Sequence, residues 1–139
     1  MKVILIDGSS LFVPAVKVFG RLKQQQAQTG NPPFILPARV TYFNSLLSCL
    51  KKVGVDKDDI LVMCQEGHSW RKDRLSTYKS QREGLREKDA FIDWTYQYQQ
   101  ANELHETLEQ ATTWKFLRVA NGLEADDLIA IGCRYFKDK

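Results

Sequence analysis

Near its start the chain reads Val3-Ile4-Leu5-Ile6-Asp7-Gly8-Ser9-Ser10, an unbroken apolar run followed by an Asp-Gly-Ser-Ser turn. Consecutive apolar residues without alternation are typical of a strand buried on both faces, as in a parallel sheet. The polar residues that follow are typical of a turn that starts a helix. The stretch therefore predicts a buried strand that leads directly into a helix.

Two more apolar runs predict strands, at Ile60-Leu61-Val62-Met63-Cys64 and at residues 114–119. Strands that alternate with helical segments are typical of a largely parallel sheet covered by helices on both faces. Such sheets place their ligand sites beyond the carboxyl ends of the strands, where Asp7, Cys64 and the turn before Glu124 lie in this sequence. The sequence therefore predicts an α/β fold with a site at that edge.

Helices are predicted between these strands from apolar residues at helical spacing. The first begins at Pro37, ends near Gly54 and is expected to bury Val40, Phe43, Leu47 and Leu50. The second is expected to bury Phe91, Trp94, Tyr98, Ala101, Leu104 and Leu108, with Tyr96 exposed. The last runs from Glu124 through Leu128, Ile131 and Tyr135. A mobile loop is predicted at residues 20–36, which include a Gln-rich stretch and Gly30-Asn31-Pro32-Pro33.

The composition of the 139 residues, 43% hydrophobic and 27% charged, is that of a single globular domain. A net charge of +3 permits a polyanionic partner without requiring one. The cysteines at positions 49, 64 and 133 are too far apart to suggest a zinc site or a disulfide framework, and they predict a reducing compartment, the cytoplasm. Asp7 interrupts the first apolar run before it reaches the length of a signal peptide, and no later run is long enough to span a membrane.

Acidic residues are concentrated in Glu124-Ala125-Asp126-Asp127, and Asp7 stands alone at the end of the first strand. One interpretation is structural, because acidic residues stabilise a first helical turn and an Asp after a strand often caps the next helix. The other is a metal site, because a hard divalent cation such as Mg²⁺ relieves the repulsion between crowded carboxylates. Two such ions about 3.5 to 4 Å apart would activate a water for phosphodiester hydrolysis.

Basic residues are concentrated between Trp70 and Lys88. This segment holds seven basic and three acidic residues, a local charge of +4 that exceeds that of the whole chain. If the segment is helical, one face carries Arg71, Arg74, Tyr78, Arg82 and Arg86. Such a stripe can hold a phosphate backbone and stack a base, and the alternative is a solvated surface helix with internal ion pairs. Apolar residues are scarce here, so a ligand is expected to order the segment.

The chain resembles the 5′ nuclease superfamily in motifs that follow the family order. They are Ile6-Asp7-Gly8-Ser9-Ser10-Leu11, Trp70-Arg71-Lys72 with Tyr78-Lys79-Ser80-Gln81-Arg82, and Gly122-Leu123-Glu124-Ala125-Asp126-Asp127-Leu128-Ile129. The superfamily includes flap endonucleases, the 5′ exonuclease domains of bacterial DNA polymerases, and phage 5′ exonucleases with RNase H activity. Each motif alone is weak, but together they are specific, and the phage enzymes are the most similar around Trp70-Arg71-Lys72-Asp73.

The resemblance implies a PIN-like, three-layer α/β/α fold with a mainly parallel sheet. Residues 1–139 are expected to form one incomplete N-terminal domain that ends after the Glu-Ala-Asp-Asp helix, with a basic arch at about 68–90. The implied ligands of Mg²⁺, or of Mn²⁺, are Asp7, Glu124, Asp126 and Asp127. The implied catalytic residues are Lys79, Arg82, Asp7 and Asp126. The implied nucleic-acid-binding residues are Arg71, Lys72, Arg74, Tyr78, Lys79, Arg82 and Arg86.

The implied activity is that of a Mg²⁺-dependent, structure-specific 5′ nuclease in DNA replication or repair. Its substrate is DNA with a single-stranded 5′ end or flap, and RNase H activity would extend this to an RNA–DNA hybrid. One departure is Cys64, which stands about where the family has an Asp, because a thiol is a poor ligand for Mg²⁺. Glu66 lies two residues further on and could replace it.

A second departure concerns the end of the sequence. The family continues with another strand, further aspartates and an element that binds duplex DNA, whereas this sequence ends at Lys139. One hypothesis is a split or assembled nuclease in which a second polypeptide supplies the strand and carboxylates. The others are a non-catalytic DNA-binding or regulatory relative that keeps the arch, and a chain that cleaves alone with a reduced acidic set.

Several polar residues are interpreted without a catalytic role. His68 and His105 have no nucleophile or metal partner at a recognisable spacing, so both are expected at the surface or at a helix end. Ser9 and Ser10 have no base nearby in the sequence, so a turn or a helix cap is expected there.

Overall fold

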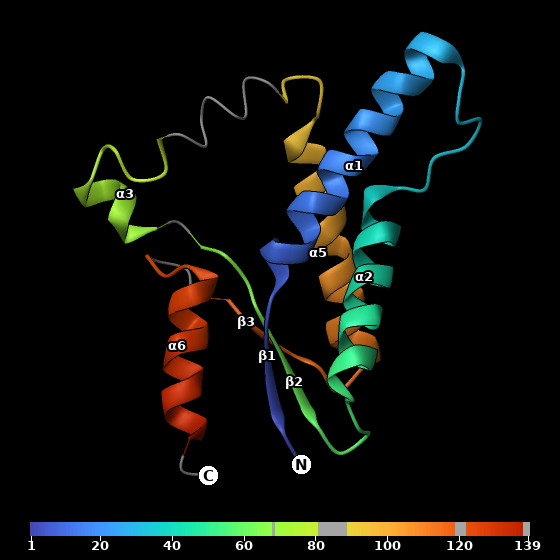
Figure 1. The fold of residues 1–139 in the computed structure, drawn as a ribbon. Coiled ribbons are helices and arrows are strands. Elements are labelled where there is room, and N and C mark those ends of the chain that lie inside the picture. Colours follow the sequence, from blue (N-terminus) through green and yellow to red (C-terminus); the bar gives the residue numbers. More distant parts are fainter. Residues whose placement is uncertain (68, 81–88, 119–121, 138–139) are drawn as a thin grey trace.

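The computed structural model describes residues 1–67, 69–80, 89–118 and 122–137 (Figure 1). Strands and helices alternate along the chain as predicted. The elements are β1 (Val3–Asp7), α1 (Gly8–Thr29), α2 (Ala38–Val53), β2 (Ile60–Cys64), α3 (Trp70–Arg74), α5 (Trp94–Ala111), β3 (Lys115–Leu117) and α6 (Ala125–Phe136).

The strands form one parallel sheet in the order β1-β2-β3. In the register of the first pair, Val3 lies beside Ile60 and Asp7 beside Cys64, so both strands end at the same edge. Because side chains alternate along a strand, Asp7 and Cys64 project to the same face of the sheet. The parallel sheet that the sequence predicts is confirmed.

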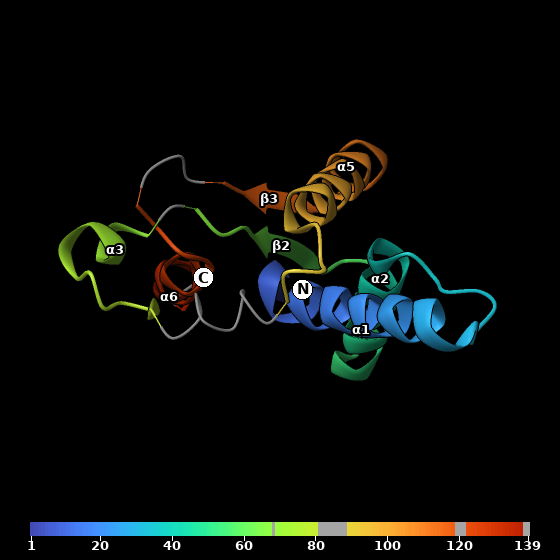
Figure 2. The ribbon, with the colours of Figure 1, turned by 90° about the horizontal axis from the view of Figure 1, so that it is seen from above.

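Helices cover both faces of this sheet (Figures 1 and 2). On one face α2 packs on the strands through a cluster of Leu46, Leu50, Leu61 and Met63. On the other face α6 packs through a cluster of Val62, Cys64, Ala125 and Leu128. Figure 2 shows α6 on one side of the strands and α1, α2 and α5 on the other. This is the predicted three-layer α/β/α arrangement.

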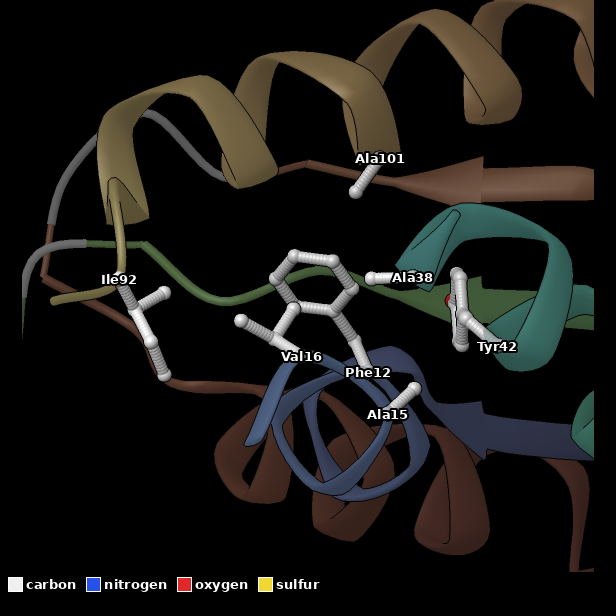
Figure 3. Packing of buried hydrophobic residues seen from close by; sticks show 7 residues of the cluster. All are labelled: Phe12, Ala15, Val16, Ala38, Tyr42, Ile92 and Ala101. Atoms are coloured by element: carbon white, nitrogen blue, oxygen red, sulfur yellow. The ribbon is translucent and has the colours of Figure 1, made fainter. Parts of the chain in front are cut away.

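A second core lies between α1, α2 and α5 (Figure 3). Its buried residues are Phe12, Ala15, Val16, Ala38, Tyr42, Ile92 and Ala101. The rings of Phe12 and Tyr42 meet edge to face, with their centroids 5.6 Å apart. This packing fixes α5 beside α1, and the candidate site uses side chains from both helices.

The predicted loop at residues 20–36 is wrong in its first half, because α1 continues to Thr29. Gln, Lys and Ala are good helix formers, so a Gln-rich stretch extends a helix as easily as it forms a loop. The helix ends at Gly30, whose φ of 74° is left-handed and whose N–H donates to the carbonyl of Gln26 at 2.8 Å. The segment between Gly30 and α2 is irregular, as predicted.

The predicted buried face of α2 is right at Leu50 and is displaced by about one residue or more at the other positions. The buried residues are Ala38, Tyr42, Leu46 and Leu50, whereas Leu47 is exposed. Two apolar stripes run along this helix at helical spacing, so periodicity alone does not separate them. The predicted end near Gly54 is confirmed, and the predicted start at Pro37 is right to within one residue, because Pro37 is the N-cap and the helix begins at Ala38.

Of the residues predicted to be buried in α5, Ala101 and Leu108 are buried, and Trp94 and Leu104 are partly buried against the second core. In α5 the buried residues are Gln97, Ala101, His105 and Leu108. Phe91 precedes the helix and is exposed, Tyr98 is 39% exposed, and Tyr96 is exposed as predicted. The helix α6 runs through Leu128, Ile131 and Tyr135 as predicted; Leu128 is buried, whereas Ile131 and Tyr135 are exposed. Their place against the sheet is taken by Gly132, where an added Cβ would lie 2.8 Å from Cδ1 of Leu5.

The cysteines form no disulfide among the described residues, and Cys64 alone of the three is buried. Within the described ranges, no helix is both long and apolar enough to cross a membrane.

Candidate active site

A cavity of about 490 Å³ lies beyond the carboxyl ends of the strands, where the sequence predicts a site. Its charged and polar lining residues are Asp7, Ser9, Ser10, Lys17, Glu66, Lys79, Asp89 and Asp126. Its other lining residues are Val13, Pro14, Trp94, Tyr98 and Ala125. The cavity therefore joins an acidic region to an apolar and aromatic wall.

Asp7 has the capping role that its position after a strand suggests. Its Oδ1 accepts hydrogen bonds from the backbone N–H groups of Ser9 at 2.9 Å and Ser10 at 3.3 Å, at the start of α1. Burial raises the pKa of Asp7 despite these bonds, and the negative charges of Glu66 and Asp126 raise it further. The capping carboxylate thus also belongs to a group of mutually repelling charges.

Glu66 enters this group from the loop after β2. Its Oε2 accepts a hydrogen bond from the Ser9 hydroxyl at 3.0 Å, and its Oε1 lies 3.7 Å from the Lys79 ammonium. Cys64, at the position where the resemblance leads one to expect an Asp, is wholly buried against α6, and burial raises the pKa of its thiol. Glu66, and not Cys64, therefore faces the cavity that Asp7 lines.

The acidic motif at the start of α6 divides into two parts. Asp126 is exposed and lines the cavity with Asp7. Glu124 is buried at the N-cap, and its backbone N–H donates to Asp127 at 3.1 Å, so these two form a capping box. Glu124 and Asp127 therefore have the structural role of a helix cap, whereas Asp126 faces the cavity.

Arg71 binds the two capping carboxylates. Its guanidinium donates to both oxygens of Asp127, at 2.7 and 2.8 Å, and to Glu124 at 3.1 Å. The hydrogen bond from Arg71 lowers the pKa of Asp127 to about 2. Tyr78 donates to Glu124 at 2.8 Å and Lys79 makes a short ion pair with it. Burial raises the pKa of Glu124, but these two hydrogen bonds outweigh it and lower the value overall.

The backbone brings α3 next to the start of α6. Ser69 and Gly122 form a parallel bridge, the Trp70 N–H donates to the Gly122 carbonyl at 3.0 Å, and the Gly67 N–H donates to Leu123 at 3.2 Å. Gly122 has a φ of 85°, a left-handed conformation that favours glycine. This contact explains why Arg71 meets carboxylates that are more than fifty residues away in the sequence.

The predicted basic stripe is not formed by the described residues. The helix that starts the segment ends at Arg74, Leu75 is extended, and Tyr78 and Lys79 lie in a turn where Lys79 has a φ of 58°. Arg71 and Lys79 point inward to the buried Glu124 and, for Arg71, the partly buried Asp127, which an exposed helical stripe would not allow. Lys72 and Arg74 are exposed.

The remaining part of the predicted arch, including Arg82 and Arg86, lies outside the described residues.

The carboxylates suit Mg²⁺ or Mn²⁺ in kind, because hard cations prefer oxygen ligands. In their arrangement they do not yet form a metal centre, since no group of three or more potential ligand residues in the described ranges is close enough to hold an ion. Of the four predicted ligands, Asp7 and Asp126 line the cavity, whereas Glu124 and Asp127 bind cationic side chains. Glu124 and Asp127 would therefore have to exchange their cationic side-chain partners for a metal ion before they could act as ligands.

Sequence reasoning missed a buried polar network behind Glu66. His105, expected at the surface or at a helix end, is buried, and its Nε2 lies 2.8 Å from the Tyr42 hydroxyl. Its Nδ1 lies 2.5 Å from the Gln65 amide nitrogen, and Arg118 in turn donates to Gln65. Burial lowers the pKa of His105 to about 4, so the ring is neutral near pH 7. His68 lies outside the described residues.

The fold and the cavity define an α/β domain with clustered carboxylates at the carboxyl edge of a parallel sheet. Residues 2–139 match the family described as 5′-3′ exonuclease, N-terminal resolvase-like domain. The chain belongs to this family, which confirms the resemblance to 5′ nucleases. No curated protein and no solved structure matches the chain.

Proposed function

We propose that the chain is a metal-dependent 5′ nuclease that cleaves DNA at or near a single-stranded 5′ end. The observation that carries the proposal is one cavity lined by Asp7, Glu66 and Asp126 together with Lys79, at the edge of the sheet where α/β proteins bind their ligands. Carboxylates beside a cation suit a reaction on a phosphodiester, because metal ions and phosphate oxygens need opposite charges as partners.

The proposed ligands of Mg²⁺, for which Mn²⁺ can substitute, are Asp7, Glu124, Asp126 and Asp127. Glu66 is added to them because it faces the same cavity as Asp7. When bound, the metal would supply an activated water and neutralise charge on the phosphate.

Phosphate would compete with Glu124 and Asp127 for the cations that bind them. Arg71, Tyr78 and Lys79 all donate to these two carboxylates, and each can instead donate to a phosphate oxygen. Nucleic acid that draws these donors away would leave the two carboxylates with only their backbone capping bonds and no cationic partner, and a divalent cation could then take that place. Binding of the strand and completion of the metal site are therefore coupled in this mechanism.

The finer details rest on the family resemblance. Arg82, Arg86, Lys72 and Arg74 are proposed to extend the phosphate contacts, with Lys79 and Arg82 holding the phosphate that is cut. Flaps and RNA–DNA hybrids are the proposed substrate structures. A role in replication or repair, a second polypeptide, and a particular likeness to phage enzymes stay predictions.

A non-catalytic DNA-binding relative is the second candidate. It is favoured by Cys64 at the end of β2 and by the cationic partners that Glu124 and Asp127 already have. Such a protein would bind DNA through the same basic residues without cleaving it.

Cleavage of a 5′-labelled flap duplex in Mg²⁺ or Mn²⁺ tests the proposal. Asp7→Asn is the informative variant, because Asn still caps a helix but is a weaker metal ligand. Asp58→Asn, at an exposed position in the turn before β2, is the matched control. We expect cutting that needs the divalent ion, is lost in Asp7→Asn and is kept in Asp58→Asn. DNA binding without any cutting would instead support the non-catalytic relative.

A further inference from the structure

Glu66 lies in the loop after β2, whereas the other proposed metal ligands lie at the end of β1 or at the start of α6. A loop residue keeps a precise place only if neighbouring contacts hold its backbone. We propose that Gln65 is a positioning residue, which holds this loop so that the Glu66 carboxylate lies in the cavity. The inference rests on the proposed nuclease function and deepens it, because it names a residue that acts on the site through one of the proposed ligands.

The backbone is held on both sides of Glu66. The Gln65 N–H donates to the carbonyl of Leu117, the last residue of β3, at 3.0 Å. The Gly67 N–H donates to the carbonyl of Leu123 at 3.2 Å. These bonds extend the sheet beyond β2, so Glu66 lies at the centre of a loop that is tied at each end.

The side chain of Gln65 is also held at both ends. Arg118, just after β3, donates to its Oε1, and the Gln65 Nε2 lies 2.5 Å from Nδ1 of His105 on α5. Arg118 is itself paired with Glu109 of α5 at 2.8 Å. Because the amide bonds to groups from two other parts of the fold, Gln65 cannot move without breaking one of these hydrogen bonds.

The hydrogen bonds form a chain with one direction. A guanidinium can only donate, so the oxygen of the Gln65 amide faces Arg118 and its nitrogen faces His105. Nδ1 of His105 therefore accepts, and its Nε2 carries the proton that is donated to the Tyr42 hydroxyl at 2.8 Å. The Tyr42 hydroxyl in turn donates to Sδ of Met63 at 4.0 Å. Reversing any member would leave a buried polar group without its partner, so the chain stabilises one orientation of the Gln65 amide.

This support matters because β2 itself contributes no carboxylate to the cavity. The strand ends at Cys64, which is buried against α6, so the carboxylate on this side of the cavity comes from Glu66 in the loop. A divalent cation requires its ligands at defined distances, and groups that orient a metal ligand typically change metal affinity or activity by about 10- to 100-fold. Gln65 thus supplies the rigidity that a position within the strand would have given.

Binding of Mn²⁺ to the purified chain without DNA, followed by the electron paramagnetic resonance signal of the free ion, tests the inference. The second measurement is the Mn²⁺ concentration that gives half-maximal cleavage of the flap duplex. Gln65→Met keeps the length and the zero charge of the side chain but removes both hydrogen bonds, and it is expected to shift these values about 10-fold. A folded Gln65→Met chain that shifts neither value would overturn the inference.

A double variant shows whether Gln65 acts through Glu66. Glu66→Gln is expected to weaken Mn²⁺ binding, and Gln65→Met combined with Glu66→Gln should weaken it no further than Glu66→Gln alone. A purely structural role of Gln65 would instead give losses that add. Additive losses would therefore overturn the positioning role.

A matched pair of arginine variants tests the other end of the amide. The Arg118 side chain is 46% exposed, so Arg118→Met is expected to fold. Losing a positive charge beside Glu66 would by itself tighten Mn²⁺ binding, whereas loss of positioning weakens it, and weaker binding is expected. Arg39 is 47% exposed and donates to Gln100 at 2.6 Å, away from the cavity lining, so Arg39→Met should leave Mn²⁺ binding unchanged. Unchanged or tighter binding in Arg118→Met would contradict the inference.

Failure of the inference and failure of the proposed function give different results. Melting temperatures show which variants are folded. If the wild-type chain cuts the flap and Gln65→Met cuts it with the same Mn²⁺ requirement, the positioning role is wrong and the nuclease function stands. If the wild-type chain neither binds Mn²⁺ nor cuts any flap, the proposed function itself is overturned.

Discussion

Acid should destabilise the protein through His105, well above the pH at which most carboxylates titrate. The ring is buried, and its pKa is lowered to about 4 by burial and by the nearby charge of Arg118. An imidazole in the unfolded chain has a pKa of about 6.5, so between these two values the unfolded state binds more protons than the folded state. Stability is therefore highest above pH 6.5, falls as the pH falls through this window, and changes no further from this source below pH 4.

The size of the effect follows from the two pKa values. By proton linkage, the free energy of unfolding should fall by about 2 kcal/mol between pH 7.5 and pH 5, and by about 3 kcal/mol by pH 4. Urea unfolding followed by circular dichroism at pH 7.5, 6.5, 5.5 and 5.0 would record it. With a slope of about 2 kcal/mol per M, the urea midpoint should fall by about 1 M over this range.

Two histidine variants isolate the source of that loss. His105→Gln is expected to be less stable at pH 7.5 by about 1–3 kcal/mol, since Tyr42 and Gln65 lose a buried partner, but its midpoint should fall less between pH 7.5 and 5. The comparison variant is His68→Gln, which removes the other histidine of the sequence and leaves His105 unchanged. If wild type and His105→Gln lose the same stability over this range, the buried neutral ring is not the cause.

Two further predictions concern the helix on the sheet and the arch. Gly132→Val should lower stability by about 1–3 kcal/mol in thermal or urea unfolding, because its side chain would meet Leu5, whereas Ala130→Val on the exposed side of α6 should cost much less. Equal losses would mean that close packing of α6 on β1 is unimportant. Lys79→Ala should lower the slope of log affinity against log salt by about 0.7 to 0.9, and Lys57→Ala at the opposite edge of the sheet should leave it unchanged. An unchanged slope for Lys79→Ala would remove that residue from the phosphate contacts.

The parts of the fold that sequence predicts well are those with local causes. The strand at Val3–Asp7 and the helix that follows it are fixed by neighbouring residues, an apolar run and an Asp that caps the next backbone amides. Except at Leu50, the buried face of α2 was predicted wrongly, because its two apolar stripes differ only in what packs on them. Tyr42 is inside because its hydroxyl meets His105, a partner 63 residues away that periodicity cannot reveal.

The sequence indicates which carboxylates follow strands or start a helix, but it does not indicate which charged side chains pair with one another. Asp7 and Asp126 share a cavity, as expected of carboxylates that follow neighbouring strands or start a nearby helix. The pairing of Arg71 with Glu124 and Asp127 depends on the bridge between Ser69 and Gly122, a tertiary contact. The charge pattern of the sequence predicted an exposed basic stripe. The pattern alone does not show which carboxylates lie close enough in the fold to pair with its arginine and lysine side chains.

The same carboxylates stabilise the fold and belong to the proposed site. A variant that tests the chemistry must therefore keep the helix cap. Asp7 caps α1 and also lines the cavity, and Glu124 caps α6 while it binds Lys79. Alanine at either position would remove a helix cap together with a charge, and the cap alone is worth about 1 kcal/mol. Asparagine at position 7 keeps the cap and removes the charge, so it tests the chemistry with little effect on the fold. Because Asp126 is exposed and lines the cavity, its amide variant should be the least disruptive test of the metal site.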